Sequence, residues 1–315
     1  MVTPTPARPD DSGRSLGGVL PDGDGCAAFS LLGPHRADLP VLIAVPHAGR
    51  TYPASLLAAM RQPQAACARL EDRLADVLAQ RVAQLTGAAL LVAQAPRAMI
   101  DLNRAPEDMD WEMVVGPPPP GTFRHAAGRR ARSGLGLVPR RLQGLGDLWR
   151  ALLPAADLQA RIELVHRPYH RALGQALEDL RDRWGAALLI DLHSMPPLGP
   201  KTGNDPAPDF VIGDRYGASC AGSLSLLANT HLAQAGQRAA HNRPYAGGYV
   251  LDRHGAPQRA LHAMQVEVCR TAYLDPALRE PGEGLEGVAQ VLAGLVRRLA
   301  QELGSQAMPL AQAAE

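Results

Sequence analysis

Two apolar runs of strand length stand out in the pattern of hydrophobic and polar positions, and each soon reaches a histidine. The first is VLIAVPHAGR, residues 41–50, and the second is LLIDLHSMPP, residues 188–197. Short continuous apolar runs bounded by turn-forming residues are typical of strands buried on both faces. We therefore predict strands over 41–45 and 187–192, with His47 and His193 in the same relative place after each.

Apolar residues at helical spacing alternate with further short apolar runs along the chain. A helix is predicted over residues 64–86, because its apolar positions recur with helical periodicity, namely Leu70, Leu74, Val77, Leu78, Val82 and Leu85. Other helices are expected over 148–184, in pieces broken at Pro154 and near Pro168, and over 223–235 and 284–303. Further strands are expected over 27–32, 88–93, 98–102 and 209–212, and residues 258–270 indicate mixed helix and strand.

This alternation indicates an α/β fold, in a single domain with a mixed, mostly parallel central sheet flanked by helices. In open sheets of this kind, ligands bind beyond the carboxyl ends of the strands. Because His47 and His193 both come at strand ends, we expect them at one functional edge. The polar N-terminus predicts a disordered arm over 1–18, followed by the main domain over 19–304 and a flexible tail over 305–315.

Residues 112–146 interrupt the pattern with PPPPG and the basic run RHAAGRRARSG. A loop of this length inside a compact domain is uncommon and tends to be functional or mobile. The net charge of the whole chain is only +1, so a general electrostatic grip on nucleic acid or on an anionic membrane is not expected. The basic run is then either a solvated insertion or a lid over an anionic substrate.

The cysteines, the apolar stretches and the N-terminus indicate the cellular compartment in which we expect the protein. Four cysteines are scattered along the chain without a CxxC pair, which favours reduced thiols over a disulfide framework or a zinc knuckle. No apolar stretch approaches the roughly 18 residues of a membrane span. The N-terminus lacks the apolar core of a secretory signal. We therefore expect a cytoplasmic protein that does not insert into membranes.

Two histidines at one edge of a sheet suggest a metal site. Catalytic zinc often takes two histidines and one carboxylate, and leaves a fourth position for water. Glu71 and Asp72, on the helix expected after the first histidine, are both candidates for the carboxylate, although such a pair on a helix is ordinarily solvated. Asp191 lies two residues before His193 and can orient its imidazole. The alternative for either histidine is a hydrogen-bonded loop residue.

Two further segments carry polar side chains that are candidates for substrate binding or catalysis. RAMIDLNR, residues 97–104, places Arg97 before an apolar run and an Asn-Arg pair after it, and arginine binds carboxylates in a bidentate manner. HAMQVEVCR, residues 262–270, places Gln265 and Glu267 on one face if the segment is extended. A carboxylate there is either a general base or part of a solvated edge strand.

The order of these motifs resembles the N-formylglutamate amidohydrolase family. The matching motifs are PHAG, the ED pair, DLNR, RPYH (167–170), DLHS, GDRYGASC (213–220), YAGGY (245–249), RHG (253–255) and QVE. They run from about residue 41 to 275, and their number and order make the signal specific. The family is similar in fold to zinc carboxypeptidases and aspartoacylases, so the resemblance implies a zinc-carboxypeptidase-like hydrolase fold and a metal-dependent catalytic domain over 19–304.

The resemblance also implies one zinc ion held by His47, His193 and an acid. Carboxypeptidases have an acidic ligand three residues after the first histidine, but this chain has Arg50 there. The acid is then Glu71 or Asp72, and the alignment with the family favours Asp72.

The resemblance further assigns roles in catalysis and in substrate binding. Glu267 takes the place of the catalytic glutamate, and Arg97 that of the group that polarises the substrate carbonyl. Asn103 and Arg104 correspond to the pair that grips the substrate carboxylate, and Tyr249 and Arg253 are expected to make further contacts.

The expected function is hydrolysis of N-formyl-L-glutamate to formate and L-glutamate, which the resemblance places in histidine degradation. The substrate would be a small N-acyl amino acid, with no nucleic-acid or membrane partner. One alternative is a related hydrolase of another N-acyl amino acid or a peptide-like amide. A second alternative is a non-catalytic protein that binds acidic ligands in the same pocket.

Overall fold

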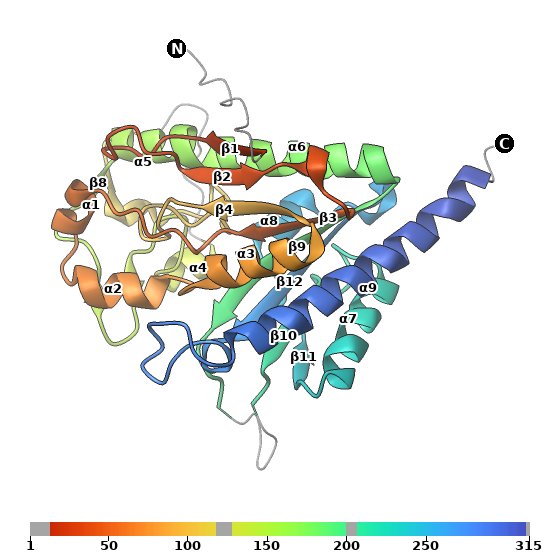
Figure 1. Ribbon diagram of the computed structural model, residues 1–315. Coiled ribbons are helices and arrows are strands. Elements are labelled where there is room, and N and C mark those ends of the chain that lie inside the picture. The colour runs from red at the N-terminus through yellow and green to blue at the C-terminus, as the bar shows by residue number, and fades with distance from the viewer. Residues whose placement is uncertain (1–12, 118–127, 200–206, 313–315) are drawn as a thin grey trace. The chain divides into compact units, whose positions relative to one another are not determined.

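The computed structural model describes residues 13–117, 128–199 and 207–312 (Figure 1). Contacts divide the chain into two compact units. The first comprises Met1–Leu31, Pro46–Glu71 and Val92–Ala172, and the second comprises Leu32–Val45, Asp72–Leu91 and Leu173–Glu315. Both units are assembled from segments that interleave along the sequence, and the prediction of one domain over 19–304 stays a prediction.

The main sheet has eight strands in the order β1-β2-β4-β3-β9-β12-β10-β11. Strand β3 pairs with β9 in parallel, β9 with β12 in parallel, β12 with β10 antiparallel, and β10 with β11 in parallel. The expected mixed, mostly parallel sheet is thereby confirmed. The strands are β1 (Arg14–Gly17), β2 (Phe29–Leu32), β3 (Val41–Val45), β4 (Ala89–Ala93), β9 (Ala187–Met195), β10 (Phe210–Gly213), β11 (Ala239–His241) and β12 (Leu261–Cys269).

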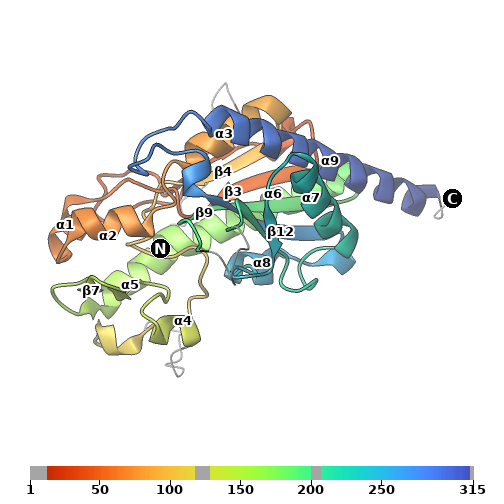
Figure 2. The same ribbon diagram turned by 90° about the horizontal axis from the view of Figure 1, so that it is seen from below.

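The centre of the second unit is formed by β9 and β12, each nine residues long and buried at every position. Each is hydrogen-bonded on both sides, which explains why both sequences are mostly apolar. Helices α3 (Ala75–Thr86), α7 (Gly222–Gln234) and α9 (Leu285–Gln312) pack together on one face of this part of the sheet, whereas α8 (Tyr249–His254) packs on β9 and β12 from the other (Figure 2). Three short 3-10 helices complete the unit, at Pro34–Arg36, Pro257–Arg259 and Arg270–Ala272.

The first unit is built from short elements around a small apolar core. Met60, Cys67, Leu70 and Leu148 are buried there, with Trp149 packed against them. Its helices are α1 (Ala54–Ala59), α2 (Pro63–Leu70), a 3-10 turn (Trp111–Met113), α4 (Arg129–Arg132), α5 (Ala155–Arg161) and a π-helix (Ile162–His166), and its short strands are β5 (Val114–Val115), β6 (Arg141–Leu142), β7 (Gly146–Asp147) and β8 (Leu153–Pro154). Helix α6 (Arg167–Trp184) begins in this unit and ends in the second.

The helix predicted over 64–86 is wrong at its centre, because two helices occupy this range. Helix α2 ends at Leu70 and α3 begins at Ala75, and Leu74 has a left-handed backbone with φ of 56°. The apolar spacing runs through the break, so periodicity alone did not reveal it. Asp72 therefore lies on the connection between two helices, where its side chain is not tied to a helix face.

The strand predicted over 98–102 is also wrong. The amides of Met99 and Ile100 donate to the carbonyl of Pro96, and that of Arg104 donates to Asp101, so the segment is a series of turns. Its apolar residues are nevertheless buried, which explains the strand-like pattern in the sequence. The predicted break near Pro168 is wrong as well, since this proline lies in the first turn of α6, directly after the π-helix.

The predicted ends of the folded region need correction. Strand β1 occupies residues within the arm expected over 1–18, and α9 continues through most of the tail expected over 305–315. The rest of both segments, residues 1–12 and 313–315, lies outside the described residues, as do 118–127 within the loop expected over 112–146. The described part of that loop contains α4, β5 and β6 and extends to the start of β7. Among the described helices, none combines the length and the apolar character needed to cross a membrane.

Candidate metal centre

His47 follows β3 in a tightly packed turn. A Cβ atom on Gly49 would lie 2.0 Å from the carbonyl oxygen of Ala95, so only glycine permits this close approach of the two backbones. The Nε2 atom of His47 lies 2.7 Å from Oδ1 of Asp101, and both side chains are buried. Arg97 Nε donates to the second oxygen of Asp101 at 2.8 Å. Asp101 therefore fixes the orientation of the His47 ring and is itself held by Arg97.

Charge determines the ionisation of Asp101. Burial favours its neutral form, but the neighbouring Arg97, His47 and Arg104 outweigh burial and hold the pKa of Asp101 well below its ordinary value. The group is thus a carboxylate that accepts from its partners.

His193 lies inside β9 rather than beyond its end, and two carboxylates face its ring. Nδ1 is 2.9 Å from Oδ2 of Asp72, and Nε2 is 2.9 Å from Oδ2 of Asp191. Burial opposes a charged imidazole, but Asp191 and Asp72 outweigh this effect and hold the pKa of His193 well above its ordinary value. The two buried carboxylates beside the imidazole thus favour its protonated, positively charged form. The expected contact between Asp191 and His193 is present.

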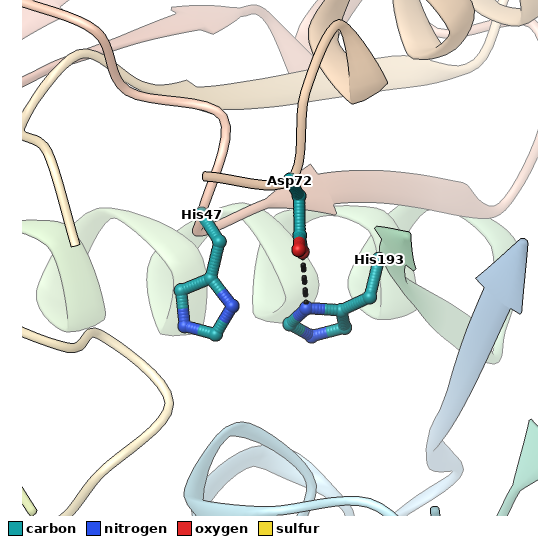
Figure 3. Close-up of side chains that lie close together, drawn as sticks. All are labelled: His47, Asp72 and His193. Carbon is teal, nitrogen blue, oxygen red and sulfur yellow. Dashed lines mark hydrogen bonds and ion pairs between the residues drawn. The ribbon is translucent and has the colours of Figure 1, made fainter. Parts of the chain in front are cut away.

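Ligand atoms of His47, Asp72 and His193 all lie within 4.8 Å of one another, and all three side chains are buried. Figure 3 shows the two rings and the carboxylate converging on one region, with the Nδ1 side of His47 facing the other two. Ligands of a tetrahedral zinc ion at about 2.1 Å are about 3.4 Å apart, which is less than the 4.8 Å limit found here, so the three side chains would draw slightly together to contact a common ion. In both histidines the other nitrogen, Nε2, meets an aspartate, which is the usual support of a metal-binding imidazole. This group can bind a metal ion.

The backbone around Asp72 is held from the C-terminal side of β12. Tyr273 donates its hydroxyl to the carbonyl oxygen of Arg73 at 2.6 Å. Arg270 Nε donates to Ser194 Oγ at 3.1 Å, and its NH2 lies 3.7 Å from Oδ1 of Asp72. Asp72 thus presents one oxygen to His193 and the other to Arg270. Arg270 and Tyr273 were not expected from the sequence, and no metal-ligand spacing marks them there.

Glu71, the other candidate for the acidic metal ligand, is hydrogen-bonded to Tyr52 instead. It is buried, and its Oε1 accepts a hydrogen bond from the hydroxyl of Tyr52 at 2.8 Å. Its carboxylate is not part of the group formed by His47, Asp72 and His193. The geometry therefore favours Asp72 as the acidic ligand.

Glu267 is the direct neighbour of His193 across the parallel pair β9–β12. Partner residues in a parallel pair point to the same face of the sheet from strands about 4.8 Å apart, so Glu267 and His193 project from the same face on adjacent strands. Gln265, opposite Asp191, donates to Oε1 of Glu267 at 2.9 Å. Both side chains are buried in a central strand, which rules out the solvated edge strand as an interpretation.

The Asn103-Arg104 pair follows Asp101 in the turn. The amide of Asn103 donates to Asp101 Oδ1 at 2.8 Å, and Arg104 Nε donates to the carbonyl of Leu135 at 2.9 Å. Burial lowers the pKa of Arg104; Asp101 opposes this change, whereas Arg97 and Arg130 add to it. Arg97 and Arg104 of the turn and Arg130 of α4 thus bring several guanidinium groups together, which favours binding of an anionic ligand.

Two histidines that were missed as site residues support this turn. His166 Nε2 lies 2.9 Å from the carbonyl oxygen of Arg104, and His170 Nε2 lies 3.0 Å from that of Leu102. A carbonyl oxygen only accepts, so each histidine carries its proton on Nε2. The π-helix that ends at His166 precedes α6, and π-helical turns are frequent at functional sites. The signal for His170 was RPYH, one of the motifs quoted for the family resemblance, whereas His166 directly precedes that motif.

Tyr249 and Arg253 lie one turn apart on α8. Arg253 donates to the hydroxyl of Tyr249 at 2.8 Å, and its guanidinium lies 5.8 Å from the centre of the tyrosine ring. These contacts join the two side chains to each other, and their role in substrate binding stays a prediction.

The fold and this cluster define an α/β protein with a candidate metal centre at the carboxyl edge of parallel strands. A sequence model described as N-formylglutamate amidohydrolase matches residues 39–274, about three quarters of the chain. The chain belongs to this family.

One curated relative and two solved structures illustrate the similarity. The N-formylglutamate deformylase of Pseudomonas putida is 29% identical over 288 residues, which cover 85% of this chain and 94% of that protein. The crystal structure of N-formylglutamate amidohydrolase from Ralstonia eutropha JMP134 is 32% identical with a TM-score of 0.79, covering 88% of this chain and 99% of that one. The gene product Atu2144 of Agrobacterium tumefaciens, at 17% identity and a TM-score of 0.62, shares the fold over 89% of this chain and 94% of its own.

Proposed function

We propose that this protein is a zinc-dependent hydrolase that cleaves N-formyl-L-glutamate to formate and L-glutamate. One observation carries the proposal: in a member of this family, ligand atoms of His47, Asp72 and His193 lie within 4.8 Å of one another. Two imidazoles and one carboxylate are the protein ligands of many catalytic zinc sites, in which a fourth position stays open. A zinc ion bound there would supply a Lewis acid and a water ionised near neutral pH.

Glu267 is proposed as the general base. Its position beside His193, on the same face of the sheet, supports this role. The carboxylate accepts a proton from the attacking water and returns it to the departing nitrogen, while a C–O bond to the formyl carbon forms and the C–N bond breaks. Gln265 holds one carboxylate oxygen at 2.9 Å, which limits the orientations of the base.

Arg97 and the Asn103-Arg104 pair are proposed to act on the substrate. Arg97 donates through Nε to Asp101 at 2.8 Å, an anchor that fixes the position of its guanidinium. There it would stabilise the oxyanion that develops on the formyl oxygen. Asn103 and Arg104 would hold a carboxylate of glutamate, so that the amide is positioned before attack. Tyr249 and Arg253 are proposed as further contacts to the substrate.

An assay that measures release of the free amino acid from every substrate, with formate determined in addition for the N-formyl substrates, tests the proposal. The purified protein is supplied with N-formyl-L-glutamate, N-acetyl-L-glutamate, N-succinyl-L-glutamate and N-formyl derivatives of neutral amino acids, with zinc content measured in parallel. We expect the highest kcat/KM with N-formyl-L-glutamate and a loss of activity after chelation. Preference for another N-acyl group would assign a related amidohydrolase, whereas bound metal without turnover of any amide would assign a ligand-binding protein.

A further inference from the structure

A cavity of about 220 Å³ lies in the first unit. Three arginines line it, Arg61, Arg140 and Arg150, together with the aromatic ring of Trp149. The volume is below the roughly 300–1,000 Å³ of pockets for drug-sized ligands, so an occupant would be small.

Arg61 and Arg150 reach this cavity from two chain segments that pair antiparallel. Met60 and Trp149 form the bridge, and on either side of it Arg61 N donates to Leu148 and Arg150 N to Ala59. Diagonal neighbours in an antiparallel pair lie about 7–8 Å apart on the same face, which is the relation that this register gives to the two arginines.

Each guanidinium is also fixed by the opposite segment. Arg61 Nε donates to the carbonyl of Trp149 at 2.8 Å, and Arg150 Nε donates to the carbonyl of Met60 at 3.0 Å. These bonds use one donor of each group. Among the described residues, no other hydrogen-bond partner engages the four terminal nitrogens, which can therefore bind a ligand in a geometry that is set before the ligand arrives.

The ion pairs around the cavity are unevenly distributed among its arginines. Arg140 is matched by Asp110 at 2.8 Å, by Glu112 at 3.0 Å and by Asp147 at 3.8 Å. In the described part of the chain, no carboxylate lies within ion-pair distance of Arg61 or Arg150. Two like charges held near each other repel, and an anion bound to both would relieve this repulsion.

An aromatic ring forms a further wall. Trp149 Nε1 donates to the carbonyl of Pro139 at 2.6 Å, and the guanidinium of Arg161 lies 5.7 Å from the ring centre, so the indole is fixed on two sides. Met113 and Leu152 add apolar surface. We propose that this cavity is a binding site for a small oxyanion, a carboxylate or a phosphate, which Arg61 and Arg150 bind together. This site does not depend on the proposed hydrolysis.

Calorimetric titration of the full-length protein tests the proposal, with inorganic phosphate and with benzoate as separate probes. We expect at least one of them to bind with a stoichiometry of about one. The Arg61→Gln/Arg150→Gln double variant should raise the Kd by at least about tenfold, because charge-assisted hydrogen bonds are lost. Binding of phosphate alone would identify an inorganic ligand, and binding of benzoate alone an organic carboxylate.

Three further variants complete the test. Arg61→Lys/Arg150→Lys keeps both charges and should bind more tightly than the glutamine pair. Arg171→Gln, at an exposed position on α6, should bind like the wild type. His193→Ala should also keep the affinity, which separates the cavity from the metal centre. The proposal is overturned if neither probe binds, if the glutamine pair retains wild-type affinity, or if His193→Ala abolishes binding.

Discussion

Nε2 of His47 lies 2.7 Å from Oδ1 of Asp101, although 54 residues separate them in the sequence. Asp101 is the first residue of DLNR, the motif that also contains the proposed carboxylate-binding pair. One turn therefore carries both the support of a metal-binding histidine and the groups proposed to hold the substrate. The same arrangement recurs at His193, where Asp191 meets Nε2.

Asp101→Asn is expected to weaken metal binding by about 10- to 100-fold, because the side chain that orients a metal-binding imidazole loses its charge. Competition with a chromogenic chelator measures the affinity. Asp182→Asn, at an exposed position on α6, is the matched control and should leave it unchanged. An unaltered affinity in Asp101→Asn would remove this residue from the support of the metal centre.

Asp72→Asn and Glu71→Gln distinguish the two candidate acids. We expect the first variant to lose bound zinc and the second to retain about one equivalent, because only Asp72 belongs to the group with His47 and His193. Elemental analysis after dialysis measures this difference. The reverse result would exchange the roles of the two residues.

Glu267→Gln should keep the metal and lower kcat by about 100- to 10,000-fold, the usual contribution of a general base. His193→Ala, in contrast, should lose both metal and activity. Near-normal turnover by Glu267→Gln, measured as formate release at saturating substrate, would remove Glu267 from the base role.

Arg104→Ala is expected to raise KM at least about tenfold and to lower kcat less, since the guanidinium acts in binding rather than in the chemical step. Arg104 also donates to the backbone of Leu135 and Asn103, so Arg104→Lys and circular dichroism accompany it as controls for folding. An unchanged KM in both variants would reject the proposal that Arg104 binds the carboxylate of the substrate.

His254 is expected to stay neutral far into the acid range. Burial, assisted by Arg253, lowers its pKa to about 3, whereas an unfolded histidine titrates near about 6.5. Its contribution to stability is therefore complete above pH about 6.5 and is lost as the pH falls toward 3. NMR should show no titration of this ring between pH 7 and 4.5 in the folded protein, and ordinary titration in urea. Titration near pH 6.5 in the folded state would contradict the assignment.

Continuous apolar runs allowed the strands to be predicted, because β3 and β9 are buried on both faces and their sequences reflect this. The separation of α2 from α3 could not be predicted in the same way. Leu70 and Leu74 continue the helical spacing through the break, and the left-handed backbone of Leu74 leaves no mark in the pattern.

The candidate site, like the fold, could be predicted from the sequence only in part. The placement of His47 and His193 after apolar runs, together with the family resemblance, allowed their pairing to be predicted. The roles of Asp101 and Arg270 could not be predicted, because they depend on tertiary contacts. Asp101 contacts His47 across 54 residues and Arg270 contacts Asp72 across 198 residues, and no local pattern encodes either contact.

Anomalous diffraction from crystals of the zinc-loaded protein, recorded on both sides of the zinc absorption edge, tests the central claim most directly. The account predicts one strong anomalous peak within about 2.3 Å of Nδ1 of His47, Nδ1 of His193 and an oxygen of Asp72. A zinc peak bound by other residues, or none near these three side chains, would contradict it.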